Sequence, residues 1–187
     1  MKNFGSRFSL YPMTDSFIDI ILGALERTDT SAVYSSTDAI STVYRGPLDS
    51  VIDALRGLFI NAFSDSVHMA IEGEMYSDVP DSIVVPEHIM GEPNMLVEKS
   101  FRVKCRLKLC PDGRTREKGI AFIRNIFDSY DALFSELTAE DITYAVKFEG
   151  DVVQMFAFLK MLCEEASKQF EGFSLHYVMN CNSPTAE

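Results

Sequence analysis

The sequence predicts an α+β protein built from two tandem ferredoxin-like repeats, each with the order strand, helix, strand, strand, helix, strand (βαββαβ). Three observations lead to this prediction. Residues 7–12 (RFSLYP) return 99 positions later as residues 106–111 (RLKLCP). Residues 31–42 (SAVYSSTDAIST) return as residues 131–143 (DALFSELTAEDIT) with one added residue. In both halves a glycine then leads into an amphipathic helix. Because the three matches come in the same order, they favour duplication of a unit of about 80–90 residues.

The first repeat is expected over residues 1–76, and hydrophobic periodicity predicts its elements. Apolar and polar side chains alternate before Pro12, which is typical of a strand that ends there. Pro47 suits the first turn of a helix because it has no backbone N–H to leave unbonded. In chain order the predicted elements are a strand at residues 8–11, a helix that Thr14 caps, strands at 32–38 and 40–45, a helix that begins at Pro47, and a strand at 67–76.

The second repeat is expected over residues 101–187, in the same order. Its predicted elements are a strand at residues 103–110, a helix that carries Ile120 to Tyr130, strands at 132–137 and 142–148, a helix from Val152, and a strand at 173–181. Residues 77–100 hold three of the seven prolines and are predicted to be an extended connector.

One face of each predicted sheet has no helix on it. Right-handed crossovers place both helices of a repeat on the same face of its sheet. Tyr11, Tyr34 and Tyr44 cannot all point toward those helices, so apolar surface lies on the opposite face as well. We therefore expect the antiparallel sheets to pack through their helix-free faces, either between repeats or between two copies of the chain.

Composition excludes several classes of protein. Seventeen Lys and Arg against 28 Asp and Glu give a net charge of −11, which disfavours nucleic acid as a partner. No apolar run reaches the roughly 20 residues of a membrane helix, and the N-terminus does not resemble a signal peptide. The four cysteines are expected to be buried, reduced thiols, as is typical of a cytoplasmic protein. Three scattered histidines predict no metal site.

The sequence holds no motif of a known catalytic centre, so we expect a protein that is not an enzyme. One strand of the second repeat nevertheless alternates basic with apolar residues; the basic ones are Arg102, Lys104, Arg106 and Lys108. Such a face could bind an anion, but Glu72 and Glu74 alternate in the same way on another strand. We favour a solvated or ion-paired face, whose charges would pair with each other if the two strands were neighbours. Residues 1–100 carry 6 basic and 15 acidic groups, which favours a cationic ligand there.

The hairpin predicted at residues 32–45 gathers aromatic, hydroxyl and carboxylate groups close to Tyr11. A flat heteroaromatic amine would bind such a mixture, since its ring can stack and its amino group needs oxygen acceptors. The candidate ligand-binding residues of the first repeat are Tyr11, Tyr34, Ser35, Thr37, Asp38 and Thr42. Their counterparts in the second repeat are Ser135, Glu136 and Thr143. The alternative interpretation is an ordinary polar hairpin in which Asp38 is a turn residue.

Residues 8–47 (FSLYPMTDSFIDIILGALERTDTSAVYSSTDAISTVYRGP) resemble the first unit of the YkoF family of thiamin/hydroxymethylpyrimidine-binding proteins, and the resemblance extends through nearly the whole chain. It implies two ferredoxin-like units, a homodimer, and binding of thiamin or its pyrimidine without chemistry. It also implies a cytoplasmic role in thiamin-precursor uptake or salvage, in contact with components of a transporter. Thiamin would be a ligand, and no cofactor is expected. The second unit differs, with Cys110 in place of Tyr11 and Glu136-Leu137 in place of Ser36-Thr37.

Two other functions fit the same pattern of elements. One is an ACT-like regulatory or assembly module, in which paired units bind an amino acid at a subunit interface. The other is an enzyme of the dimeric α+β-barrel kind. The acidic first half and the polar hairpin favour a cationic heteroaromatic ligand over a zwitterionic amino acid.

Overall fold

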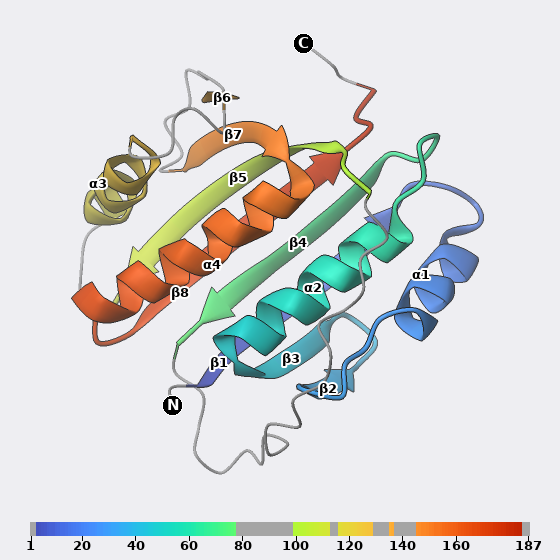
Figure 1. Cartoon of the computed structure of the whole chain (residues 1–187), viewed down its shortest axis with the longest axis horizontal. Helices are drawn as coiled ribbons and strands as arrows, with labels where there is room; N and C mark the ends of the chain where they lie inside the picture. Colours follow the sequence, from blue (N-terminus) through green and yellow to red (C-terminus); the bar gives the residue numbers. More distant parts are fainter. Residues whose placement is uncertain (1–2, 78–98, 113–115, 129–134, 137–144, 185–187) are drawn as a thin grey trace.

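In the computed structural model, eight strands form one antiparallel sheet with all the described helices on one side of it (Figure 1). The structure describes residues 3–77, 99–112, 116–128, 135–136 and 145–184. The helices α2 and α4 lie over the centre of the sheet, and α1 and α3 lie at its flanks (Figure 1). The predicted α+β class with tandem ferredoxin-like repeats is confirmed.

Both halves of the chain contain the same order of elements. The first half contains β1 (Asn3–Pro12), α1 (Phe17–Glu26), β2 (Tyr34–Thr37), β3 (Thr42–Pro47), α2 (Leu48–Ala62) and β4 (Met69–Tyr76). The second half contains β5 (Arg102–Pro111), α3 (Arg116–Phe127), β6 (Ser135–Glu136), β7 (Val146–Asp151), α4 (Val152–Gln169) and β8 (Phe173–Cys181).

Some element boundaries differ from the prediction. The strand β1 begins at Asn3, well before the predicted start. The cap of α1 is Ser16 rather than Thr14, and the Thr14 hydroxyl accepts a hydrogen bond from the Ser16 N–H instead. Several predicted segments lie outside the described residues: the end of the third helix at Tyr130, most of the strand at 132–137, the first three residues of the strand at 142–148, and nearly all of the connector.

The two repeats join edge to edge. The order across the sheet is β2-β3-β1-β4-β8-β5-β7-β6, so the closing strands of the two repeats are neighbours at its centre. They pair from Met69↔Cys181 to Tyr76↔Ser174. This corrects the expectation that the sheets of the two repeats pack through their helix-free faces: joining the open edges satisfies a full row of backbone hydrogen-bonding groups. Packing of that face between two copies stays a prediction.

The core lies between the sheet and the helices and is continuous across the two repeats. The central helices meet at Phe59 of α2 and Phe156 of α4, whose ring centroids are 6.2 Å apart. Phe101, just before β5, stacks on Phe63 at 3.7 Å. Burying such rings removes large apolar areas from water, so this contact contributes strongly to holding the repeats together.

A tyrosine crosses the junction between the repeats beneath the helices. Tyr177 of β8 is fully buried, and its hydroxyl is hydrogen-bonded to the Ser6 hydroxyl of β1 at 3.0 Å. Between these strands lies Gly73 of β4, where a Cβ atom would meet the Tyr177 hydroxyl and the backbone of Arg7. The absent side chain at position 73 is therefore what lets Tyr177 span β4.

The structure also describes the state of the four cysteines and the length and polarity of the helices. All four cysteines are free; three are buried and Cys110 is half-buried. Burial raises the pKa of the Cys181 thiol to about 11, so this thiol is protonated at neutral pH. Among the residues that the structure describes, no helix is long and apolar enough to cross a membrane, and no group of three or more His, Cys, Asp or Glu side chains is arranged to hold a metal ion.

Candidate functional site

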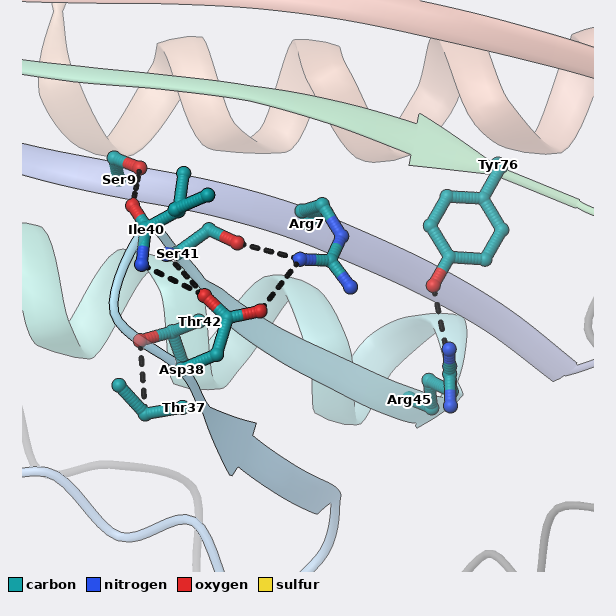
Figure 2. A network of polar contacts seen from close by, with 9 residues as sticks. All are labelled: Arg7, Ser9, Thr37, Asp38, Ile40, Ser41, Thr42, Arg45 and Tyr76. Atoms are coloured by element: carbon teal, nitrogen blue, oxygen red, sulfur yellow. Dashed lines mark hydrogen bonds and ion pairs between the residues drawn. The ribbon is translucent and has the colours of Figure 1, made fainter.

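The turn between β2 and β3 is closed by Asp38 and folds onto β1 (Figure 2). The Asp38 Oδ1 atom accepts hydrogen bonds from the backbone N–H groups of Ile40 and Ser41, both at 2.8 Å. Its Oδ2 atom accepts one from Nη1 of Arg7 at 3.2 Å. Asp is favoured in turns because its side chain can accept hydrogen bonds from the backbone N–H groups two and three residues later in the chain.

These bonds also fix the charge of Asp38. The backbone N–H groups of Ile40 and Ser41, and then the Arg7 guanidinium, hold the pKa of its carboxyl below the usual 3.8. At neutral pH the group is therefore a carboxylate that only accepts hydrogen bonds. Its side chain is 57% exposed, so a ligand can reach it.

Two further bonds attach the turn to β1. Nη1 of Arg7 also donates to the Ser41 hydroxyl at 2.6 Å, and the Ser9 hydroxyl donates to the Ile40 carbonyl at 3.0 Å. Arg7 and Ser9 alternate on the helix-free face of β1. The tip of the hairpin is thus held on that face, next to Val43, which is buried there.

A second cluster on the same face surrounds Arg45 of β3. Its Nε donates to the Tyr76 hydroxyl at 3.2 Å (Figure 2). Its guanidinium carbon lies 5.7 Å from the centroid of the Tyr34 ring. Tyr76 extends from β4 across β1 over Gly5, where a Cβ atom would collide with its ring. A cation at this distance from an aromatic ring is attracted to its face.

Three hydroxyl residues of the hairpin, Ser35, Thr37 and Thr42, lie on its helix side. The hydroxyls of Thr37 and Thr42 are 3.0 Å apart, and Ser35 is exposed opposite Tyr44. Tyr44 is fully buried, and its hydroxyl has no hydrogen-bond partner among the described residues. Burial raises the pKa of this hydroxyl to about 12. Buried polar groups usually have a partner, so this side of the hairpin is also a candidate site.

The predicted site residues of the first repeat therefore divide between two faces. Tyr11, Tyr34 and Asp38 lie on the helix-free face, and the Ser and Thr residues lie on the other. Tyr34 pairs with Arg45, which in turn pairs with Gly5 of β1. Tyr11 lies six residues beyond Gly5 along β1, which corresponds to about 20 Å. Tyr11 and Tyr34 cannot stack on the same ring.

In the second repeat the corresponding positions carry different charges. Register places Lys104 and Glu149 opposite each other, where the first repeat has Gly5 and Arg45. Ser135 and Glu136 form β6, paired with Glu149 and Phe148, and Thr143 lies outside the described residues. The arrangement around Arg45 is thus particular to the first repeat.

Sequence reasoning missed Arg7, Arg45 and Tyr76 as members of the candidate site. A usable signal was that Arg7 and Arg45 are two of only six basic residues in the first 100. The role of Tyr76 follows only from the pairing of β4 with β1, which periodicity does not reveal.

The acidic and basic strands, whose charges would pair if they lay side by side, are not neighbours. The strand β8 lies between β4 and β5. Glu72 of β4 is 3.1 Å from Nε2 of His176 on β8, and Arg102 of β5 bonds Glu149 of β7 at 2.9 Å. The charges of this face are thus partly compensated, but through different partners.

These features define a class: a tandem ferredoxin-like protein whose polar side chains gather on a strand hairpin, with no arrangement for metal binding in the described part of the chain. A family model described as the YKOF-related family matches residues 3–82. The chain is 30% identical over 187 residues to YkoF of Bacillus subtilis (strain 168), which is described as a proposed HMP/thiamine-binding protein; the match covers 97% of this chain and 91% of that protein. The chain belongs to the YkoF-related family.

Proposed function

We propose that the chain binds hydroxymethylpyrimidine or thiamin at the β2–β3 hairpin and releases it chemically unchanged. The observation that carries this proposal is the match, over almost its whole length, to a relative described as a proposed HMP/thiamine-binding protein. The helix-free face of the hairpin supports it with an aromatic ring, an exposed carboxylate and the Ser41 hydroxyl.

The pyrimidine ring is the part of the ligand that this site suits. Tyr34 offers a ring for stacking, and the Asp38 carboxylate can accept a hydrogen bond from the amino group of the pyrimidine. The two residues lie four positions apart along one strand direction, about 13 Å, which is further than one pyrimidine ring spans, so each is a separate candidate contact for the ring. Charges nearby cancel, with Arg7 and Arg45 against Asp38 and Glu74. The positive thiazolium ring of thiamin thus gains little here, and we expect hydroxymethylpyrimidine to bind at least as tightly as thiamin.

Other features of the proposal follow the resemblance to the family. The chain acts as a homodimer in the cytoplasm, in thiamin-precursor uptake or salvage, and contacts components of a transporter. The helix-free sheet face is the surface through which two copies pack. Sedimentation analysis tests the dimer, and mass spectrometry of recovered ligand tests the absence of chemistry.

A second candidate function has one observation in its favour. Arg45 has no carboxylate partner among the described residues, although its guanidinium is held in place by Tyr76 and Tyr34. Such a group binds carboxylates well, as an ACT-like module that recognises an amino acid would require. Titration with free amino acids distinguishes this function from binding of a pyrimidine.

The test is calorimetric titration with thiamin, hydroxymethylpyrimidine and a set of amino acids. Replacing Asp38 with Asn keeps an oxygen for the turn but removes the negative charge and half of the acceptors. We expect Asp38→Asn and Asp38→Ala to weaken binding of either pyrimidine about tenfold or more, since the amino group of the ligand loses its charged acceptor. Asp65→Asn, an exposed acid at a distance from the hairpin, is the matched control and leaves affinity unchanged. An unchanged dissociation constant in Asp38→Asn removes Asp38 from the site, and binding of amino acids alone supports the second function.

A further inference from the structure

The helix α1 exposes an apolar flank that the proposed ligand site does not use. Ile18 and Leu22 are 56% and 54% exposed, and Leu25 is exposed as well. Their spacing of four and then three residues aligns them in one stripe along the helix. On the inner side of the helix, Ala24 is fully buried and Ile20 packs against the core. The helix thus has one apolar side that is covered and one that is bare.

The bare surface extends to the residues that precede the stripe. Met13 and Phe17 are also exposed, so five of the eight exposed large hydrophobic side chains of the described chain fall within residues 13–25. Single exposed apolar residues are normal, whereas a group of this size marks a binding surface. In Figure 1, α1 lies at the rim of the helical layer, beside α2.

Acidic residues border the stripe. Asp19 and Glu26 are seven residues apart and therefore lie on the same side of α1, next to Leu22. Both are exposed and have no salt-bridge partner among the described residues. Arg27, which follows the helix, donates to the Asn61 carbonyl at 2.7 Å and forms no ion pair with either acid. This flank is apolar in the middle and negatively charged along one edge.

We propose that this flank of α1 binds a basic amphipathic helix of another protein. The apolar face of such a helix would cover Ile18, Leu22 and Leu25, as in other complexes where a helix docks on an apolar surface. Its Lys or Arg residues would lie opposite Asp19 and Glu26, which gives the contact its specificity and speeds association.

Charge argues against the other occupants of this surface. Two copies of α1 packed on each other would bring like charges together, because residues 17–26 contain two acids and no Lys or Arg. An anionic membrane surface would be repelled for the same reason. Residues 78–98 of the same chain contain five acids and no Lys or Arg, so they do not complement the acidic edge either.

The test uses a fluorescent synthetic peptide of about 18 residues with Leu at helical spacing and Lys on its flanks, and a second peptide with Glu in place of every Lys. Anisotropy measures the affinity of the full chain for each. We expect Leu22→Gln to weaken binding of the Lys peptide about tenfold, and Asp19→Lys with Glu26→Lys to weaken it at least as much. Val153→Gln, an exposed aliphatic residue on α4, is the matched control and leaves the affinity unchanged. Leu22 is exposed and Gln has good helix propensity, so the variant keeps its fold.

Several results would overturn the proposal. Equal binding of the Glu and Lys peptides would remove the role of charge, and equal effects of Leu22→Gln and Val153→Gln would place the contact elsewhere. Loss of self-association in Leu22→Gln, seen by sedimentation, would make the occupant a second copy. Faster proteolytic cleavage within residues 78–98 in Leu22→Gln than in the unaltered chain would show that this segment of the same chain is the occupant. We expect Leu22→Gln to bind thiamin with the same affinity as the unaltered chain. The result of the peptide experiment therefore does not depend on whether the proposed ligand site is correct.

Discussion

At the scale of single residues, Asp38 both closes the β2–β3 turn and presents an exposed carboxylate. The sequence predicts the turn role from its residue type, and the structure shows the bonds that produce it. Arg7 was not predicted as its partner, because the contact joins positions 31 residues apart. Local chemistry is thus readable from sequence, whereas the guanidinium groups that adjoin the site depend on strand register.

The lowered pKa of Asp38 predicts a pH dependence. Because the folded pKa lies below 3.8, the contribution of this group to stability is present above that value and is lost as pH falls through the folded pKa. We expect the amide signals of Ile40 and Ser41 to shift at a midpoint below 3.8 in an NMR titration from about pH 6 to about pH 2. Asp38→Asn should abolish that midpoint. A midpoint at or above 3.8 would contradict the assigned hydrogen bonds.

At the scale of elements, periodicity predicts most helices and strands but not their ends. The helix α2 and the strand β8 fall where the pattern of apolar residues places them. The predicted N-cap of α1, Thr14, was wrong. Thr14 and Ser16 both have side chains that suit a cap, and only the local backbone conformation selects between them. The pairing of β4 with β8 could not be predicted. Apolar and polar side chains would alternate along both strands in the same way whichever strand lay beside them.

Asp151 is predicted to matter most among the helix N-caps that the structure describes. Its Oδ1 accepts from the N–H groups of Val153 and Gln154 at 2.8 and 3.3 Å, whereas Ser16 and Pro47 give α1 and α2 no side-chain cap bond. We expect Asp151→Ala to cost about 0.5–2 kcal/mol, which lowers Tm by about 2–4 °C per kcal/mol in a chain of this size. Asp151→Asn, which can still cap, should retain most of the stability. Equal losses in both variants would show that charge, rather than capping, is what Asp151 supplies.

At the scale of the whole molecule, contacts across the β4–β8 junction make the two repeats one body. The sheet is continuous, α2 meets α4 at Phe59 and Phe156, and Lys160 of α4 forms an ion pair with Asp49 of α2. We expect unfolding to proceed as a single transition. Ligand binding at one repeat would then stabilise the other as well.

The hydrogen bond between Tyr177 and Ser6 tests that coupling. Tyr177→Phe leaves the buried Ser6 hydroxyl without its partner and is expected to cost about 1–3 kcal/mol in chemical denaturation, with one transition retained. Adding Ser6→Ala should recover part of the loss, since both polar groups are then gone. Separate transitions for the two halves in Tyr177→Phe would show that the repeats fold independently.

The strand order has a consequence for how the protein behaves at high concentration. Among the described residues, the longest strands lie in the interior of the sheet, and its two rims are β2, with four residues, and β6, with two. A rim this short offers few unpaired backbone groups for another chain to extend, which limits the growth of fibrils by strand addition. Fusing two small folds through their long edges thus gives resistance to aggregation that neither half would have alone.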